Sequence, residues 1–230
     1  RRQRQMCIRD RYNVIMSKIY IAKDAHYHLK EYLTGLGHVL EPISSNGIVD
    51  RGISNHPDIF LCKMGIGDKA PVYMAAPEDL GRYYPQDAAF NAACTGKYFI
   101  HNLSCTAPRL LKVAEEMGMY LIDVKQGYTK CSIAIVDENS IITYDAGIAK
   151  ACEGIEDLSV LLVQPGFVRL DGYDTGFIGG TCGRVGDELV FNGDLSSHPD
   201  FPRILEFTEE RGIRCKWFPE YQLTDIGSIL

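Results

Sequence analysis

The most constraining feature of this sequence is a recurring segment: an amphipathic helix, then a glycine, then a short apolar strand. In the clearest copy, Leu110, Ala114 and Met117 share one helical face, and Gly118 precedes an apolar strand over 119–122. Glycines that follow such helical patterns are Gly37, Gly96, Gly118, Gly154 and Gly212. Because one such unit cannot bury its apolar face alone, repetition predicts that neighbouring units pack on one another.

Hairpins precede several of these helices. Three pairs of short apolar runs flank turn residues: 59–64 with 72–74, 131–136 with 141–144, and 177–185 with 189–191. The repeat is therefore strand, strand, helix, strand, which predicts an α/β fold. A strand near the N-terminus and the segment 223–229 together complete one further unit. We expect a propeller-like ring, closed by strands from both ends, with a central cleft for ligands.

Length and composition favour a single domain over 16–230. The chain has 230 residues, of which 46% are hydrophobic. Residues 1–15 lack apolar periodicity, and Met6–Arg11 resembles the translation of a transposon-end adapter used in sequencing libraries. We expect 1–15 to be a non-native or disordered tail and the natural start to be Met16, although a basic nucleic-acid-binding arm is the alternative.

Charge and cysteine usage exclude several classes of partner. Residues 1–15 contain five Arg and one Asp, so the rest of the chain carries −10 within a total of −6. An acidic body repels nucleic acid and anionic membranes and attracts cations, so we expect a small cationic ligand. None of the 8 cysteines forms a C-x-x-C pair, and no secretion signal is evident. We expect reduced thiols, a cytoplasmic location, and no metal or other cofactor.

Two His-Pro-Asp triplets are candidates for chemistry. His56-Pro57-Asp58 precedes the apolar run 59–62, where residues two apart on a strand share one side. Asp58 can then orient the His56 imidazole or bind a cationic group. The alternative is a turn stiffened by proline. The second triplet, 198–200, precedes a predicted helix, and we interpret Ser197 or Asp200 as its cap.

A candidate nucleophile follows a Gly-containing turn. Cys131 comes directly after Lys130, in the segment 125–132, and a nearby cation lowers the pKa of a thiol. The alternative is an inert cysteine that points into the core.

Other polar residues are candidates for a binding site. Asp87 and Asn91 are four apart in a predicted short helix over 86–94, and so share one face. They are either satisfied internally or line a pocket. Gly179 and Gly180, which follow Asp174, permit positive φ or a close approach of the backbone to a ligand.

The repeated units and several phrases resemble the guanidino-group-modifying enzymes, also called penteins, and in particular a bacterial branch of that superfamily. It includes arginine deiminases, agmatine deiminases, dimethylarginine hydrolases and amidinotransferases. The phrases are Tyr84-Pro-Gln-Asp, Val124-Lys-Gln-Gly-Tyr and Gly176-Phe-Ile-Gly-Gly, within a resemblance over Met16 to the C-terminus. It implies an α/β propeller of strand–strand–helix–strand units with pseudo-fivefold arrangement.

The resemblance also implies roles for individual residues. Cys131 would attack a guanidino carbon, His56 would shuttle protons, and Asp58 would hold the cationic nitrogens. Candidate substrate-binding residues are Asp87, Asn91, Lys125, Asp174 and Asp225.

The sequence departs from the family at two places. The family nucleophile lies at the C-terminus, where this chain has no cysteine, and the family motif Glu-Gly-Gly-Asp appears here as Ile178-Gly179-Gly180-Thr181. Two hypotheses follow: a cysteine-dependent hydrolase or transferase acting on a small guanidino or amidino compound, or a non-catalytic protein of the same fold that binds a small ligand or a protein partner. The oligomeric state is not determined by the sequence.

Overall fold

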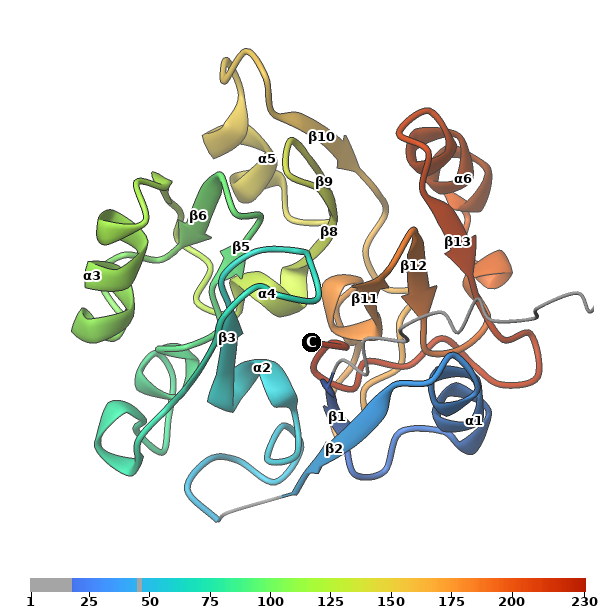
Figure 1. Ribbon diagram of the computed structural model, residues 1–230, viewed down its shortest axis with the longest axis horizontal. Coiled ribbons are helices and arrows are strands. Elements are labelled where there is room, and N and C mark those ends of the chain that lie inside the picture. Colours follow the sequence, from blue (N-terminus) through green and yellow to red (C-terminus); the bar gives the residue numbers. More distant parts are fainter. Residues whose placement is uncertain (1–17, 45–46) are drawn as a thin grey trace, which may run out of the picture.

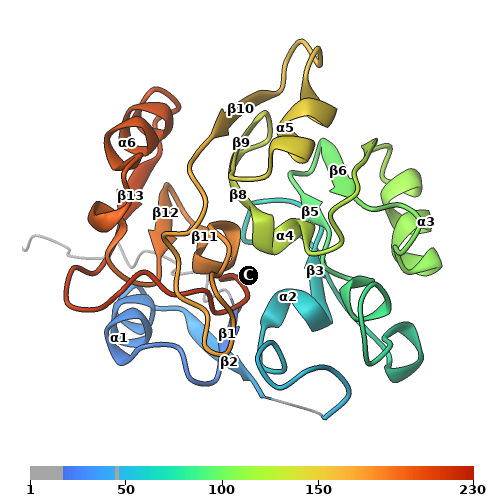
Figure 2. The ribbon, with the colours of Figure 1, turned by 180° about the vertical axis from the view of Figure 1, so that it is seen from behind.

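In the part of the chain that the structure describes, five small sheets lie around a common centre, close to which the chain ends (Figure 1). The computed structural model describes residues 18–44 and 47–230. The expected tail over 1–15 lies outside these residues. The helices α1, α3, α5 and α6 lie at the periphery in both views, whereas α2 and α4 lie near the centre (Figures 1 and 2).

Three of the sheets repeat one pattern: two antiparallel strands, a helix, and a third strand parallel to the second. The first comprises β5 (Ala93–Cys94), β6 (Tyr98–His101), α3 (Pro108–Glu116) and β7 (Tyr120–Asp123). The second comprises β8 (Ile133–Asp137), β9 (Ser140–Thr143), α5 (Ala146–Cys152) and β10 (Ser159–Leu162). The third comprises β11 (Cys182–Val185), β12 (Glu188–Phe191), α6 (Phe201–Glu209) and β13 (Arg214–Lys216). The predicted strand–strand–helix–strand unit is confirmed in these sheets.

One sheet combines the two ends of the described chain. Its strands β1 (Lys18–Ala22) and β2 (Val39–Ile43) are parallel, and α1 (Tyr27–Gly35) connects them. Tyr20 and Leu230 exchange backbone hydrogen bonds of 2.8 and 3.1 Å, so the C-terminal segment lies beside β1. The predicted C-terminal strand over 223–229 is wrong, because these residues form only an isolated bridge at Thr224, and the final residue, Leu230, is the one that pairs with β1.

The remaining sheet is shorter than predicted. It contains only β3 (Leu61–Lys63) and β4 (Val72–Met74), which are antiparallel. Two single 3-10 turns follow, η1 (Pro77–Asp79) and η2 (Gln86–Ala88). The predicted helix over 86–94 is therefore wrong, and β5 already begins at Ala93. The physical reason is that the Asn91 side chain forms hydrogen bonds with the backbone of Asp58 and Cys131, which fixes a non-helical path.

The glycines after the helices act largely as predicted. Gly118, Gly154 and Gly212 follow α3, α5 and α6 with φ of 69°, 83° and 69°, a conformation that favours glycine. Gly96 also has positive φ, 97°, but it lies in the turn between β5 and β6.

Apolar clusters lie between neighbouring sheets. In one of them, Ile142 of β9 packs in the same cluster as Phe191 of β12 and Ile204 of α6, all fully buried. The region between the sheets at the common centre is instead polar, because buried side chains such as Asp58, Asn91 and Asp225 gather there. In the described residues, no helix has the length and apolarity that spanning a bilayer requires.

Candidate active site

Equivalent positions of several sheets supply the polar centre. Three short helical turns lead directly into the first strand of a sheet: α2 (Pro57–Phe60) into β3, α4 (Thr129–Ser132) into β8, and η3 (Gly179–Thr181) into β11. The C-terminal segment that pairs with β1 is preceded by 225–228. We call the buried residues that meet there the central cluster: His56, Asp58, Asn91, Lys130, Cys131, Asp225 and Ser228.

Cys131 points into the central cluster. Its Sγ donates to Asp58 Oδ2 at 3.0 Å and accepts from Asn91 Nδ2 at 3.3 Å. Its backbone N–H donates to Asn91 Oδ1 at 3.1 Å. The sulfur is therefore held by polar groups of two other segments, and the described hydrophobic clusters do not include it.

Asp58 links the thiol to the far side of the cluster. Its Oδ2 also accepts from Ser228 Oγ at 2.6 Å, and Ser228 Oγ accepts from Lys130 Nζ at 2.9 Å. The other oxygen, Oδ1, is buried and has no hydrogen-bond partner among the described residues. Sequence reasoning missed Ser228, because a lone serine in an apolar terminal segment carries no signal.

His56 stands beside the thiol and a second carboxylate. Its ring, Cys131 Sγ and an Asp58 oxygen offer atoms that all lie within 4.8 Å of one another. Its Nδ1 lies 3.8 Å from Asp225 Oδ1 and makes no hydrogen bond in the described structure. A Cβ on Gly227 would lie 2.1 Å from His56 Cβ, so glycine is required there.

His56 and Asp58 lie close together as predicted, but the strand geometry that we expected to place them there is wrong. They do not lie two apart on a strand, because α2 begins at Pro57 and Asp58 is on its first turn. His56 is extended, with φ −73° and ψ 119°, and both side chains still reach the cluster.

The predicted helix cap in the second triplet, His198-Pro199-Asp200, is also wrong for Asp200. Asp200 stands at the N-cap position of α6, but its side chain does not cap the helix. It accepts from the Gln164 backbone at 2.7 Å and from Arg203 Nη1 at 2.7 Å.

Asp225 is held by backbone donors. It accepts from the N–H groups of Phe177 and Gly227, each at 2.9 Å. Burial raises the pKa of Asp225 to about 6, although both backbone hydrogen bonds oppose this. A Cβ on Gly180 would lie 2.0 Å from Asp225 Oδ1, so this glycine permits the close approach of Asp225. The alternative role of the two glycines, a positive φ, is not found at Gly179 or Gly180.

Burial also dominates the protonation of the other three groups. It raises the pKa of Asp58 and lowers that of His56, which the Asp58 charge partly offsets. It raises the pKa of the Cys131 thiol well above its usual value, and Asp58 and Asp225 act in the same direction. The expected lowering by Lys130 is wrong, because the Lys130 amine donates to Ser228 and to Gly179 O instead of approaching the sulfur.

The remaining predicted residues lie apart from these contacts. Asp87 is buried and accepts from Tyr128 Oη at 2.8 Å. It does not share a helical face with Asn91, because η2 ends at Ala88. Lys125 and Asp174 are exposed and line two separate surface depressions, neither of which includes a member of the central cluster.

A cavity of about 240 Å³ opens beside the cluster. His56 and Asp225 line it, together with Asp24, Asp171 and Asn192. Asp58 and Cys131 do not line it, so the thiol lies behind the wall that His56 forms. Its lining contains three carboxylates and one guanidinium, that of Arg169, which pairs with Asp171 at 2.8 Å, and this excess of negative groups makes the cavity suited to a cation.

His56, Asp58 and Cys131 together offer a nitrogen, an oxygen and a sulfur ligand, a donor set that suits Zn²⁺. A search for C-x-x-C spacing does not detect such a set, because its members come from two distant segments. The expectation of no metal stays a prediction.

The model of a family of unknown function, DUF6873, matches residues 67–230. The matched region contains Asn91, Cys131 and Asp225, and begins after His56 and Asp58. No curated protein and no solved structure matches the chain.

Proposed function

The chain belongs to the DUF6873 family of unknown function, and we propose that it is a cysteine-dependent hydrolase or transferase acting on a small guanidino or amidino compound. One observation carries this proposal: the Cys131 sulfur faces buried polar groups, with Asp58 Oδ2 at 3.0 Å and the His56 ring in the same 4.8 Å cluster. A cysteine that served only packing would face the apolar core.

We also propose that the fold is pentein-like, with pseudo-fivefold arrangement. The sheets around one centre support this, as does the antiparallel-then-parallel strand pattern shared by three of them. The order is similar in the sheet of β1 and β2, where Leu230 pairs with β1, and α1 leads to the parallel strand β2. Residues that are distant in the sequence then meet at the centre, which is the arrangement that the proposed chemistry needs.

The charge of the site favours a cationic substrate. Asp225 lines the cavity, and Asp58 lies behind His56 with one oxygen unpartnered. A planar amidinium group carries its positive charge on N–H donors, which carboxylates accept in pairs. Binding such a group in the cavity against Asp225 offsets the charge of that carboxylate. That change also lowers the pKa of the Cys131 thiol, because the Asp225 charge acts to raise it.

The proposed reaction uses the thiol as a covalent nucleophile. The S–H proton moves to His56, which burial keeps neutral, and sulfur forms a bond to the amidino carbon. The C–N bond to the leaving amine then breaks, and the amine takes the proton from His56. Water, or an acceptor amine in a transferase, adds to the carbon and gives a proton to His56. The C–S bond then breaks, and the departing thiolate takes the proton back from His56, which restores both the thiol and the neutral imidazole.

A second function is supported by the enclosure of the thiol. Cys131 is only 3% exposed, and burial raises the pKa of its thiol. These features suit a non-catalytic protein of this fold that binds a small cationic ligand in the cavity beside His56.

A substrate screen distinguishes the two functions. Purified protein is incubated with small guanidino and amidino compounds, and released ammonia or amine is measured. For the enzyme, we expect turnover that Cys131→Ala abolishes without unfolding the protein. Cys182→Ala is the matched control, because Cys182 is also fully buried but contacts the carbonyl of Ile178.

Thiol labelling gives an independent readout. A haloacetamidine, which resembles the substrate group and alkylates thiols, is expected to modify Cys131 ahead of Cys62 and Cys182. Turnover that survives Cys131→Ala, or labelling confined to Cys62 or Cys182, would contradict the catalytic role. Saturable binding of a guanidino compound without turnover or labelling would favour the binding protein.

A further inference from the structure

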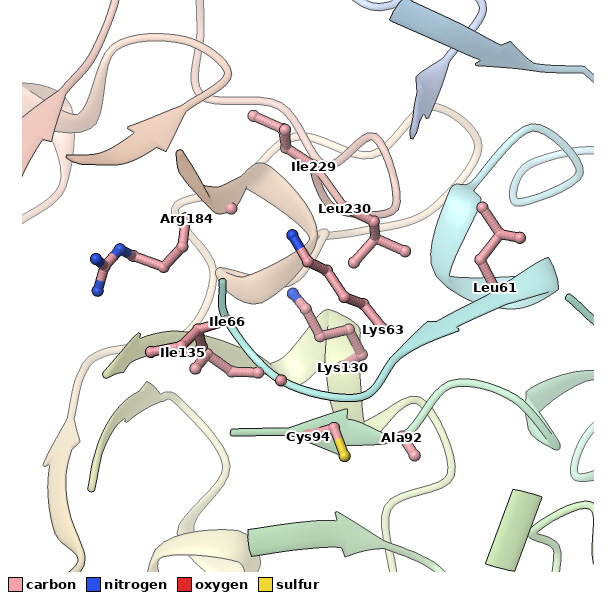
Figure 3. A pocket seen from close by; sticks show the side chains of 12 residues that line it. Leu61, Lys63, Ile66, Ala92, Cys94, Lys130, Ile135, Arg184, Ile229 and Leu230 are labelled. Atoms are coloured by element: carbon pink, nitrogen blue, oxygen red, sulfur yellow. The ribbon is translucent and has the colours of Figure 1, made fainter. Parts of the chain in front are cut away.

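A second cavity lies beside the central cluster, and it is cationic. Figure 3 shows its lining, which comes from β3, β8, β11 and the segment 229–230 among others. It shares no lining residue with the cavity beside His56. Lys63, Lys130 and Arg184 line it, and no acidic side chain does. In a chain with a net charge of −6, this grouping does not follow from composition.

The two lysines direct their amines to one space. In Figure 3 the side chains of Lys63, at the end of β3, and Lys130, in α4, run side by side. Burial lowers the pKa of Lys63, and the charges of Lys130 and Arg184 act in the same direction, opposed by Asp68. Two neighbouring ammonium groups repel each other, and an anion between them would remove this repulsion.

Unused hydrogen-bond donors point to the same conclusion. Lys130 Nζ carries three N–H groups and uses two, toward Ser228 and Gly179. Within the described part of the chain, the Lys63 amine forms no hydrogen bond or ion pair. The Nε of Arg184 is buried without a partner there, while its two other nitrogens donate to the carbonyls of Val136 and Gly186. Of these three donors, Arg184 Nε is the one that is buried without an acceptor, whereas the free N–H groups of Lys63 and Lys130 line the cavity and can donate to a ligand there.

We propose that this cavity binds a small oxyanion of the phosphate or sulfate type, held between the amines of Lys63 and Lys130. Such an ion supplies negative charge and several acceptor oxygens at once, which matches both the charge and the unused donors. The proposal does not depend on the function assigned to Cys131.

Lys63 is the residue to replace. Lys130 also bonds to Ser228, which bonds to Asp58, so its loss would disturb the central cluster. Lys63→Met keeps most of the unbranched apolar stem and removes the ammonium group with its charge and its N–H donors. The matched control is Lys69→Met, which makes the same change at an exposed position six residues away that does not line the cavity.

The experiment titrates the full chain with inorganic phosphate and with sulfate by calorimetry, at constant ionic strength set with chloride. We expect saturable binding of either oxyanion to the unmodified protein and to Lys69→Met. We expect at least a tenfold weaker affinity for Lys63→Met. Thermal unfolding in buffer without oxyanions should show Lys63→Met to be at least as stable as the unmodified protein, because one of two neighbouring charges is gone.

The proposal is overturned if neither oxyanion binds the unmodified protein above the chloride background. It is equally overturned if the two lysine variants lose affinity to the same extent, because the effect would then be one of net charge. If Lys63→Met does not fold, Lys63→Gln is titrated in its place. The same tenfold loss of affinity is expected for that variant.

Discussion

Asp225 makes the stability of this protein depend on pH in a direction opposite to that of an ordinary paired carboxylate. Its pKa is raised from 3.8 to about 6 by burial. The folded state therefore holds this proton more tightly than the unfolded chain does. Its contribution to stability is fully present below about pH 4, and it is lost as the pH rises through about 6. The difference amounts to about 3 kcal/mol, at 1.36 kcal/mol for each pKa unit.

The perturbation that isolates this group is Asp225→Asn. The quantity to measure is the free energy of unfolding of the unmodified protein minus that of the variant, from urea denaturation at several pH values. The amide can accept only one of the two N–H bonds from Phe177 and Gly227, which adds a penalty of about 1–3 kcal/mol that is constant with pH. The pH-dependent part reports on the carboxyl group alone.

Between pH 4.5 and 7.5 we expect this difference to fall by about 2 kcal/mol, since about 1 kcal/mol of the total is already lost at pH 4.5. Repulsion between Asp225 and Asp58 acts in the same direction, because it too appears only when both are ionised. Asp157→Asn serves as a control of opposite sign. Asp157 is exposed and its pKa is lowered by Lys97, so its difference should rise with pH. A difference for Asp225→Asn that stays constant or rises would refute the reasoning.

Three further predictions concern the same centre. Gly180→Ala should destabilise the protein by at least about 2 kcal/mol, measured by urea denaturation, because the new Cβ would lie 2.0 Å from Asp225 Oδ1. Gly35→Ala, with no atom within 4 Å of its Cβ, should instead be neutral or stabilising by up to about 1 kcal/mol. Labelling of Cys131 by a neutral alkylating reagent, followed by mass spectrometry, should be slow at pH 7 and accelerate above pH 9. Asp58→Asn should accelerate the labelling at every pH, because the Asp58 charge raises the pKa of the thiol. Labelling that is already maximal at pH 7 would contradict the raised pKa. Turnover, once a substrate is found, should survive dialysis against EDTA; loss that Zn²⁺ restores would assign a metal role to His56, Asp58 and Cys131.

Local pattern was sufficient for the repeating unit. Apolar periodicity and the helix-ending glycine predicted α3 with Gly118 and α6 with Gly212, because both signals act within a few residues. The same reasoning failed at 86–94. There the apolar residues resemble a helical face, but the Asn91 side chain bonds across the ring to Asp58 and Cys131 and fixes another path.

The sequence by itself determined the chemical types at the site and the order of its units. His56, Asp58 and Cys131 were identified from residue type and from a family resemblance, and the two chain ends were expected to share a sheet. The protonation of the thiol, the part played by Ser228, and the pairing of Lys63 with Lys130 were decided only by the tertiary structure. These depend on burial and on distances between segments as far as 170 residues apart, as for Asp58 and Ser228. Neighbours in the sequence do not encode such distances, and the adjacent Lys130 directs its amine to Ser228 and Gly179 instead of to the sulfur.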